Sequence, residues 1–131
     1  MDDSGAEVRQ ADRPTTQIRL ARADVMIATA EQIIRQAGHD AIALGKLEEP
    51  EQTPARLEVR ARLAYAVSLC REAVTHLAEA AGSSVHMLDQ PFQRALRDLS
   101  VLSTHVVFDL DTAFELHGRA IVGLPPNSVL T

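Results

Sequence analysis

The stretch DQPFQRALRDLSVLSTHVVF, residues 89–108, decides how the rest of the chain is interpreted. Asp89 can cap a helix, and Pro91 stands in the first turn, where its missing N–H group costs nothing. With an advance of roughly 100° per residue, one mostly apolar set of side chains collects on one side of this predicted helix. The set comprises Phe92, Leu96, Leu99, Leu102, Ser103, Val106 and Leu110. Such a pattern is typical of a helix that packs one face against a core.

A second set of side chains lies on the other side of the same predicted helix. The helical advance places four of them within about 60° of one another: Arg94, Asp98, Val101 and His105. Spacing alone fits a solvent-exposed ion pair, worth about 0.3–0.5 kcal/mol, beside an exposed histidine. The alternative is the polar wall of a ligand cavity. There the imidazole of His105 would donate to an oxyanion or exchange a proton near neutral pH.

The composition predicts one helical domain. The chain has 131 residues, of which 46% are hydrophobic and 24% charged, so it has enough apolar surface for a single core. Aromatic residues make up only 3%, and Ala, Leu, Arg and Glu dominate, which favours helix. A formal net charge of −5 without a basic face argues against a general nucleic-acid binder.

Neither a membrane span nor a signal peptide is predicted. No apolar run approaches the ~18 residues of a membrane span, and the first residues, MDDSGAEVRQ, are polar. Cys70 is the single cysteine and lies within an apolar helical run, which is typical of a buried, inert thiol in a reducing compartment. We therefore expect a cytoplasmic protein.

Hydrophobic periodicity predicts an all-α, antiparallel four-helix bundle without strands. The predicted helices span residues 16–47, 54–81, 90–108 and 112–122. A flexible leader, the bundle domain and a C-terminal tail then occupy residues 1–14, 15–125 and 126–131. On the first helix the period assigns the core face to Ile18, Ala21, Val25, Ala28, Ile33, Ala37, Ile42 and Leu44. On the last helix it assigns the core face to Ala113, Phe114, Leu116 and Ile121.

The sequence does not indicate metal or thiol chemistry. A di-iron bundle requires Glu-x-x-His pairs on two helices, but Glu72 and His76 are four residues apart and no second copy occurs. No Cys/His cluster has the spacing of a zinc site. The glycine and two serines at residues 82–84 do not open directly into a helix, so a helix-ending turn is favoured over a phosphate cradle. We predict no metal.

Residues 93–125, QRALRDLSVLSTHVVFDLDTAFELHGRAIVGLP, resemble the C-terminal helical domain of the acyl-CoA dehydrogenase superfamily. The resemblance is strongest to the flavin-dependent two-component monooxygenases that hydroxylate aromatic and polyketide substrates. The matching elements are Gly82-Ser83, the PxQRxxRD run at Pro91–Asp98, His105 and the glycine spacing of Gly118–Gly123. The two preceding helices fit the same domain, so the resemblance covers about residues 16–125.

The resemblance implies a role for several residues. In that family this domain is a four-helix bundle that forms the oligomer core and one wall of the flavin pocket. A histidine at the position of His105 lies near the reactive edge of the flavin and supports its hydroperoxide, which implies that His105 is catalytic. Ser83, Arg94 and His105 would contact the cofactor. The structural ion pair that ties helices or subunits together would involve Arg94, Arg97 and Asp98.

The family's enzymes also have an N-terminal helical domain and a middle β-domain, which hold most contacts to flavin and substrate. The first hypothesis is therefore a subunit that completes an active site with a separate flavin-binding, dehydrogenase-like chain. Reduced flavin (FMN or FAD) would be held only with that partner, and the substrate would be a small hydrophobic molecule of aromatic or polyketide type.

Two alternatives belong to other classes of protein. One is a repurposed bundle that binds a biosynthetic intermediate and uses His105 for a non-redox step such as cyclisation. The other is a non-catalytic oligomerisation or scaffold module. In every case we expect a homo-oligomer or a heteromer, because a bundle taken from an oligomer core exposes apolar helix surface.

Overall fold

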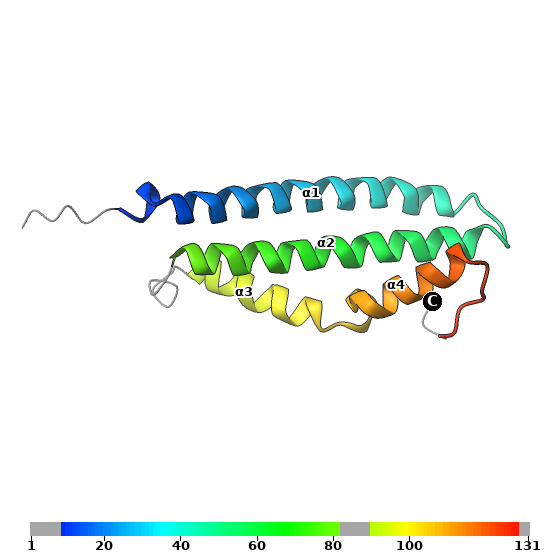
Figure 1. Cartoon of the computed structure of the whole chain (residues 1–131). Coiled ribbons are helices and arrows are strands. Elements are labelled where there is room, and N and C mark those ends of the chain that lie inside the picture. Colours follow the sequence, from blue (N-terminus) through cyan, green and yellow to red (C-terminus); the bar gives the residue numbers. More distant parts are fainter. Residues whose placement is uncertain (1–8, 82–89, 129–131) are drawn as a thin grey trace, which may run out of the picture.

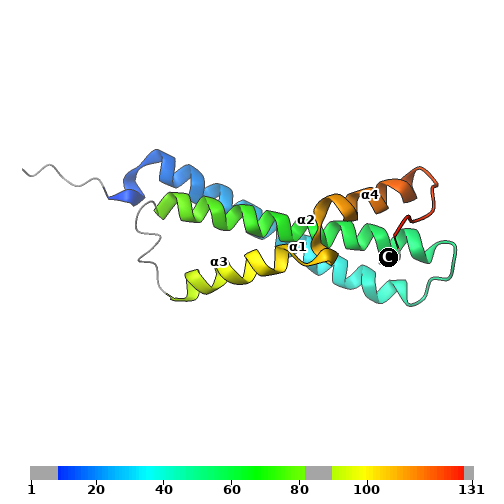
Figure 2. The same cartoon turned by 90° about the horizontal axis from the view of Figure 1, so that it is seen from below.

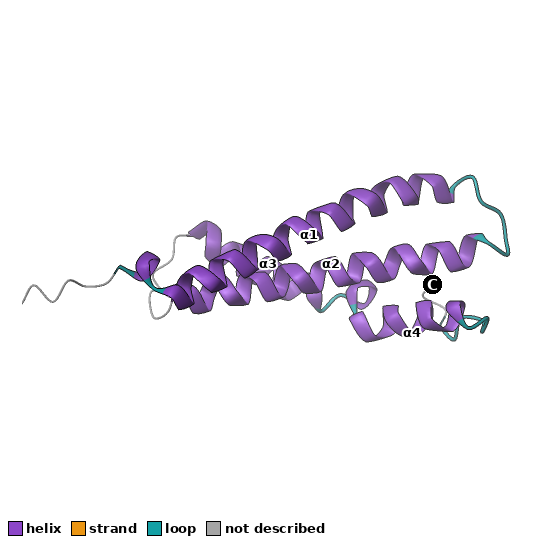
Figure 3. Cartoon of the chain, turned by 45° about the horizontal axis from the view of Figure 1, so that its top comes forward, coloured by secondary structure: helices purple, strands orange, loops and turns teal. Residues whose placement is uncertain are grey.

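The computed structural model describes residues 9–81 and 90–128. In this part of the chain it contains four α-helices and two short 3₁₀ helices, and no strand. The α-helices are α1 (Pro14–Leu44), α2 (Gln52–Ala81), α3 (Gln90–Ser103) and α4 (Leu110–Ile121). The 3₁₀ helices are η1 (Gln10–Asp12) and η3 (Val106–Phe108). The predicted all-α class is confirmed, and Figure 3 shows that helix accounts for most of the described chain.

The central element is α2 (Figure 1). Helix α1 runs antiparallel along one side of α2, and α3 and α4 follow one another along the opposite side. Seen from below in Figure 2, α3 accompanies the C-terminal half of α2 and α4 accompanies its N-terminal half. Because α3 and α4 pack against α2, much of the surface of α1 is not covered by any of the described helices.

Helices α1 and α2 meet along rows of small residues at every seventh position, here called the alanine seam. On α1 the row consists of Ala23, Ala30 and Ala37, each 1% exposed. On α2 it consists of Val59, Ala66, Ala73 and Ala80, all buried. Seven residues are about two helical turns, so each row runs nearly straight along its helix. The small side chains allow the two backbones to approach closely, and larger side chains such as Ile33 and Leu69 pack beside them.

The predicted core face of α1 is largely wrong. Of the eight predicted positions, Ala37 is buried and Ile33 and Leu44 are half-buried. The other five are exposed: Ile18, Ala21, Val25, Ala28 and Ile42. The contact with α2 follows the alanine seam. Helix α1 carries apolar residues on several sides, so periodicity alone does not show which of these sides is buried.

Helix α4 packs on α2 through its own small buried face. Ala113 and Leu116 are buried as predicted, opposite a face of α2 that includes Leu57. Phe114 and Ile121, which were also predicted to be in the core, are 46% and 71% exposed. Phe114 instead lies beside Tyr65 at the surface, with 6.3 Å between the ring centroids. The buried face of this short helix is therefore too narrow for all four side chains.

The structure describes part of the predicted leader and part of the segment that follows α4. Within the predicted leader, Gln10–Asp12 form a 3₁₀ turn, and residues 1–8 lie outside the described part. Helix α1 begins at Pro14, where proline is favoured. At the other end, the Arg119 side chain donates a hydrogen bond to the Pro125 carbonyl at 2.8 Å, which fastens the segment that follows α4.

Candidate functional site

The first half of α3 brings three of the predicted residues together. Arg94, Arg97 and Asp98 are exposed and line one concavity of about 460 Å³, with Pro91 and Ala95. The apolar side of the same helix, which includes Leu96 and Leu99, is half-buried where α3 packs on α2. The polar residues therefore point away from the chain's own core, as the helical spacing predicts.

The three charged groups are not paired with one another. Among the described residues, neither Arg94 nor Arg97 forms an ion pair with Asp98. The simple i, i+4 ion pair on one helix is thus not formed in this structure. A role for these residues in tying two chains together stays a prediction. Two guanidinium groups and one carboxylate line the concavity, where they can meet a ligand or a second chain.

His105 does not lie on α3, which corrects the helix predicted to run to residue 108. The helix ends at Ser103, and the N–H of His105 donates to the Leu102 carbonyl in a tighter turn. The hydroxyl groups of Ser103 and Thr104 donate to carbonyls three residues back, at 3.0 and 2.7 Å. Such side-chain bonds compete with the helical pattern, and the β-branched residues that follow lower the helical propensity further. His105 is not among the residues that line the concavity with Arg94 and Asp98.

The imidazole of His105 has a defined local environment. Its Nδ1 atom accepts a hydrogen bond from the backbone N–H of Val107 at 3.2 Å. The ring lies beside Phe108, with 6.2 Å between the centroids and a tilt of 60°. A nitrogen that accepts a hydrogen bond carries no proton, so the neutral ring in this arrangement has its proton on Nε2. Since His105 is exposed, its Nε2–H group is available as a donor.

The turn that carries His105 is fastened to α2 by a residue that sequence reasoning missed. The Nε–H group of Arg60 donates to the Val107 carbonyl at 3.4 Å. Just beyond the turn, Asp109 caps α4 by accepting from the Thr112 N–H at 3.2 Å and from the Thr112 hydroxyl. These hydrogen bonds hold the pKa of Asp109 below its usual range, and the nearby charge of Arg60 contributes in the same direction. No sequence signal connects Arg60 with Val107, which is 47 residues away.

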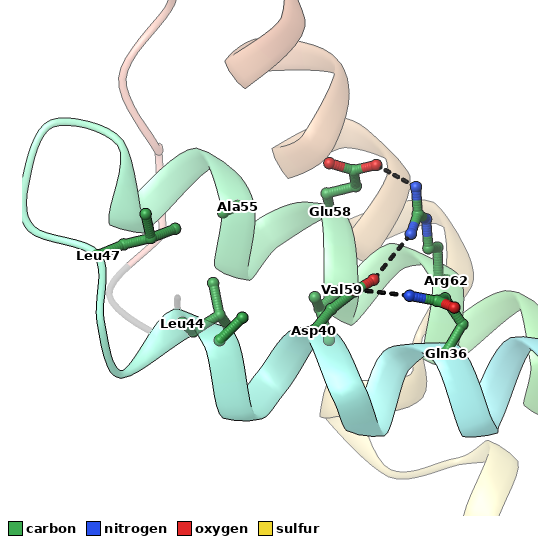
Figure 4. A pocket seen from close by; sticks show the side chains of 9 residues that line it. Gln36, Asp40, Leu44, Leu47, Ala55, Glu58, Val59 and Arg62 are labelled. Atoms are coloured by element: carbon green, nitrogen blue, oxygen red, sulfur yellow. Dashed lines mark hydrogen bonds and ion pairs between the residues drawn. The ribbon is translucent and has the colours of Figure 1, made fainter.

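A second polar cluster lies at the loop end of the α1–α2 pair (Figure 4). Arg62 of α2 reaches Asp40 of α1 at 3.1 Å and also pairs with Glu58, while Gln36 donates to Asp40 at 2.9 Å. A cavity of about 470 Å³ lies here, with apolar residues such as Leu44 among those that line it. Arg62 pairs with both carboxylates. We therefore interpret the cluster as a clamp between two helices.

The remaining chemical expectations can be placed in the structure. Ser83 lies in the segment 82–89, outside the described residues. Cys70 is half-buried, and burial raises the pKa of its thiol, which keeps the group protonated. In residues 9–81 and 90–128, no group of three or more His, Cys, Asp or Glu side chains could hold a metal ion. No helix in this part is long and apolar enough to cross a membrane.

Comparison with known proteins then identifies the family. Residues 3–110 match the family model described as acyl-CoA dehydrogenase, C-terminal domain. The chain belongs to this family. The match includes the Arg94–Asp98 concavity and the His105 turn, so the family assignment covers the whole candidate site.

Similar proteins are hydroxylases. The chain is 32% identical over 127 residues to the pigment production hydroxylase of Rhodococcus sp. (strain ATCC 21145), covering 95% of this chain and 32% of that protein. It is 29% identical over 127 residues to the oxygenase component of the FADH(2)-dependent resorcinol hydroxylase of Rhizobium sp. (strain MTP-10005). That match covers 94% of this chain and 31% of that protein. The solved structure of 3-HSA hydroxylase from Rhodococcus sp. RHA1 superimposes on this chain with a TM-score of 0.79 at 25% identity. The superposition covers 92% of this chain and 31% of the hydroxylase chain. The chain thus spans about a third of the length of these relatives.

Proposed function

We propose that this chain forms the helical wall of a flavin-dependent hydroxylase active site, completed by a separate flavin-binding chain. The observation that carries the proposal is the match of almost the whole chain to proteins named as hydroxylases, one of them FADH(2)-dependent. The substrate class would be a small aromatic or polyketide-type molecule. In this proposal the flavin-binding chain supplies the flavin and substrate contacts that these 131 residues do not provide.

The described residues fit one side of a flavin site. Guanidinium groups bind phosphate through paired hydrogen bonds, so Arg94 and Arg97 suit the anionic part of a flavin nucleotide. The exposed Nε2–H group of His105 is a donor of the kind that stabilises a developing negative charge. When bound, reduced flavin supplies the electrons that activate dioxygen. In this proposal His105 is the catalytic residue, and its task is to donate a hydrogen bond beside the reactive edge of the flavin.

The open face of α1 supports association with another chain. Leu20, Ile27 and Ile34, seven residues apart, are 44%, 45% and 47% exposed. Ile18, Val25 and Ile42 add further exposed apolar surface to the same helix. Leu20, Ile27 and Ile34 form one stripe along α1, whereas Ile18 and Val25 lie on a different side of the helix. Exposed apolar surface of this kind marks interaction sites in soluble proteins. We infer that a second copy of this chain or the flavin-binding chain covers α1.

A chimera tests the proposed function. The matching segment of the pigment production hydroxylase would be replaced by this chain, and a flavin reductase would supply reduced flavin. Flavin binding is measured by fluorescence quenching and hydroxylated product by chromatography, with the hydroxylase lacking that segment as the control. We expect the chimera to bind flavin and form product. A folded chimera that binds flavin no better than the shortened control would contradict the proposal and favour a scaffold role.

A further inference from the structure

The turn between α3 and α4 holds His105 through one residue, Val107. The Val107 N–H donates to Nδ1 of His105 at 3.2 Å, and the Phe108 N–H donates to the His105 carbonyl at 2.9 Å. The Val107 carbonyl accepts from Arg60 of α2 at 3.4 Å. A chain of hydrogen bonds therefore leads from the central helix to the imidazole ring.

This turn has little stability of its own. It is a 3₁₀ helix of three residues, Val106–Phe108, and Val107 is 43% exposed. Short 3₁₀ helices have poor hydrogen-bond geometry and depend on their surroundings. The direction of the Val107 N–H therefore depends on what holds the turn against α2. Arg60 supplies a hydrogen bond at its centre.

Arg60 also acts on the far end of the same connection. Its positive charge lies close enough to Asp109, the cap of α4, to favour the ionised carboxylate. One side chain of α2 thus interacts with the turn that carries His105 and with the start of the next helix. Arg62, two residues further along α2, points to other partners, Asp40 and Glu58. A comparison of Arg60 and Arg62 variants therefore distinguishes loss of the hydrogen bond to Val107 from loss of a positive charge on α2.

We propose that Arg60 is a positioning residue, which holds the Val107 N–H on Nδ1 of His105 and so fixes the ring as the donor of an Nε2–H group. The consequence for catalysis rests on the proposed function, whereas the effect on the ring is a property of this chain alone. A hydrogen bond of ordinary net strength shifts the ratio of two tautomers by roughly two- to tenfold. That shift is the quantity to measure.

Long-range ¹H–¹⁵N NMR of the histidine side chains reports the tautomer ratio directly. In the wild-type chain, at a pH where the rings are neutral, we expect a higher Nε2–H fraction for His105 than for His39, which is exposed on α1. In Arg60→Met, whose side chain has no hydrogen-bond donor, the His105 ratio should fall by about two- to tenfold, towards that of His39. In Arg62→Met it should stay at the wild-type value.

An unchanged ratio in Arg60→Met, or an equal fall in Arg62→Met, would overturn the proposal. If Arg60→Met does not fold, Arg60→Ala takes its place with the same expectation, because alanine also has no side-chain donor. In the chimera, Arg60→Met should lower kcat with little change in KM. A tautomer shift without that loss would support positioning by Arg60 and count only against the catalytic role of His105.

Discussion

The α1–α2 pair and the α3–η3–α4 segment are built on different principles. The pair consists of two helices of 31 and 30 residues that meet along the alanine seam, with most of the chain's fully buried residues. The segment consists of helices of 14 and 12 residues, of which only α4 contributes fully buried residues in the described part. Every site residue that was predicted from the sequence and is described in the structure belongs to the second region, whereas Arg60 contributes from α2. The comparison shows that the long α1–α2 pair provides the stable framework, whereas the short α3–η3–α4 segment carries the predicted site residues.

Truncating the same residue type in each region gives the largest expected contrast. Leu57 is 1% exposed on α2, so Leu57→Ala should lower the free energy of unfolding by about 2–5 kcal/mol through the cavity it leaves. Leu99 of α3 is half-buried, so Leu99→Ala should cost clearly less, about 1–2 kcal/mol. Urea unfolding of both variants measures the difference. Equal losses would show that α3 is as much a part of the framework as α2.

Enlarging the alanine seam should have the next largest effect. Ala66 is 0% exposed, so Ala66→Leu inserts a larger side chain where two backbones meet and should destabilise by about 1–3 kcal/mol. Ala95→Leu, at an exposed position of α3, serves as the control and should stay within about 0.5 kcal/mol. The contrast is measured by urea unfolding. A seam that accepts leucine without loss would mean that the two helices are not closely packed.

The cap of α4 should give a smaller, pH-dependent effect. The folded pKa of Asp109 lies below its ordinary value of 3.8, so its stabilising contribution is present above that value and is lost as pH falls through the folded pKa. Asp109→Asn keeps a capping oxygen but does not titrate. The thermal midpoint of the wild type should therefore fall more steeply below pH 3.8 than that of Asp109→Asn. Parallel curves would contradict this role of the carboxylate.

The open face of α1 should contribute least to the stability of the single chain and most to assembly. Ile27 is 45% exposed, so Ile27→Glu should change the free energy of unfolding of the monomer by no more than about 0.5 kcal/mol. The same change should lower the mass of a homo-oligomer measured by light scattering. Thr75→Glu, at an exposed position of α2, should leave the mass unchanged. Unchanged mass in Ile27→Glu would place the interface elsewhere.

Much of the fold could be predicted from the sequence, and the failures have physical causes. The four helices and the all-α class follow from periodicity and are confirmed in the described part of the chain. The face of α1 was predicted wrongly because this helix carries apolar residues on several sides, so periodicity does not single out the row of Ala23, Ala30 and Ala37. The end of α3 was missed because side-chain hydroxyls, such as that of Thr104, compete for its last carbonyls.

The candidate site was predicted only in part. Arg94, Arg97 and Asp98 share a concavity because they lie on one helix, and helical spacing is readable from sequence. The position of His105 depends on where that helix ends. The end of the helix is determined both by local side-chain hydrogen bonds and by tertiary packing, and the spacing of residues does not reveal it. The contribution of Arg60 depends on contact between residues far apart in the chain, which periodicity does not reveal.

The measurement that tests the account most directly is product formation by the chimera carrying His105→Ala. Loss of the Nε2–H donor should lower the rate by about one to three orders of magnitude, or about 1.4–4 kcal/mol of transition-state stabilisation. The thermal midpoint should stay unchanged, because His105 is exposed and lies outside the framework. His39→Ala, an exposed histidine of α1, should match the parent in both respects. A His105→Ala chimera as active as its parent would contradict the account.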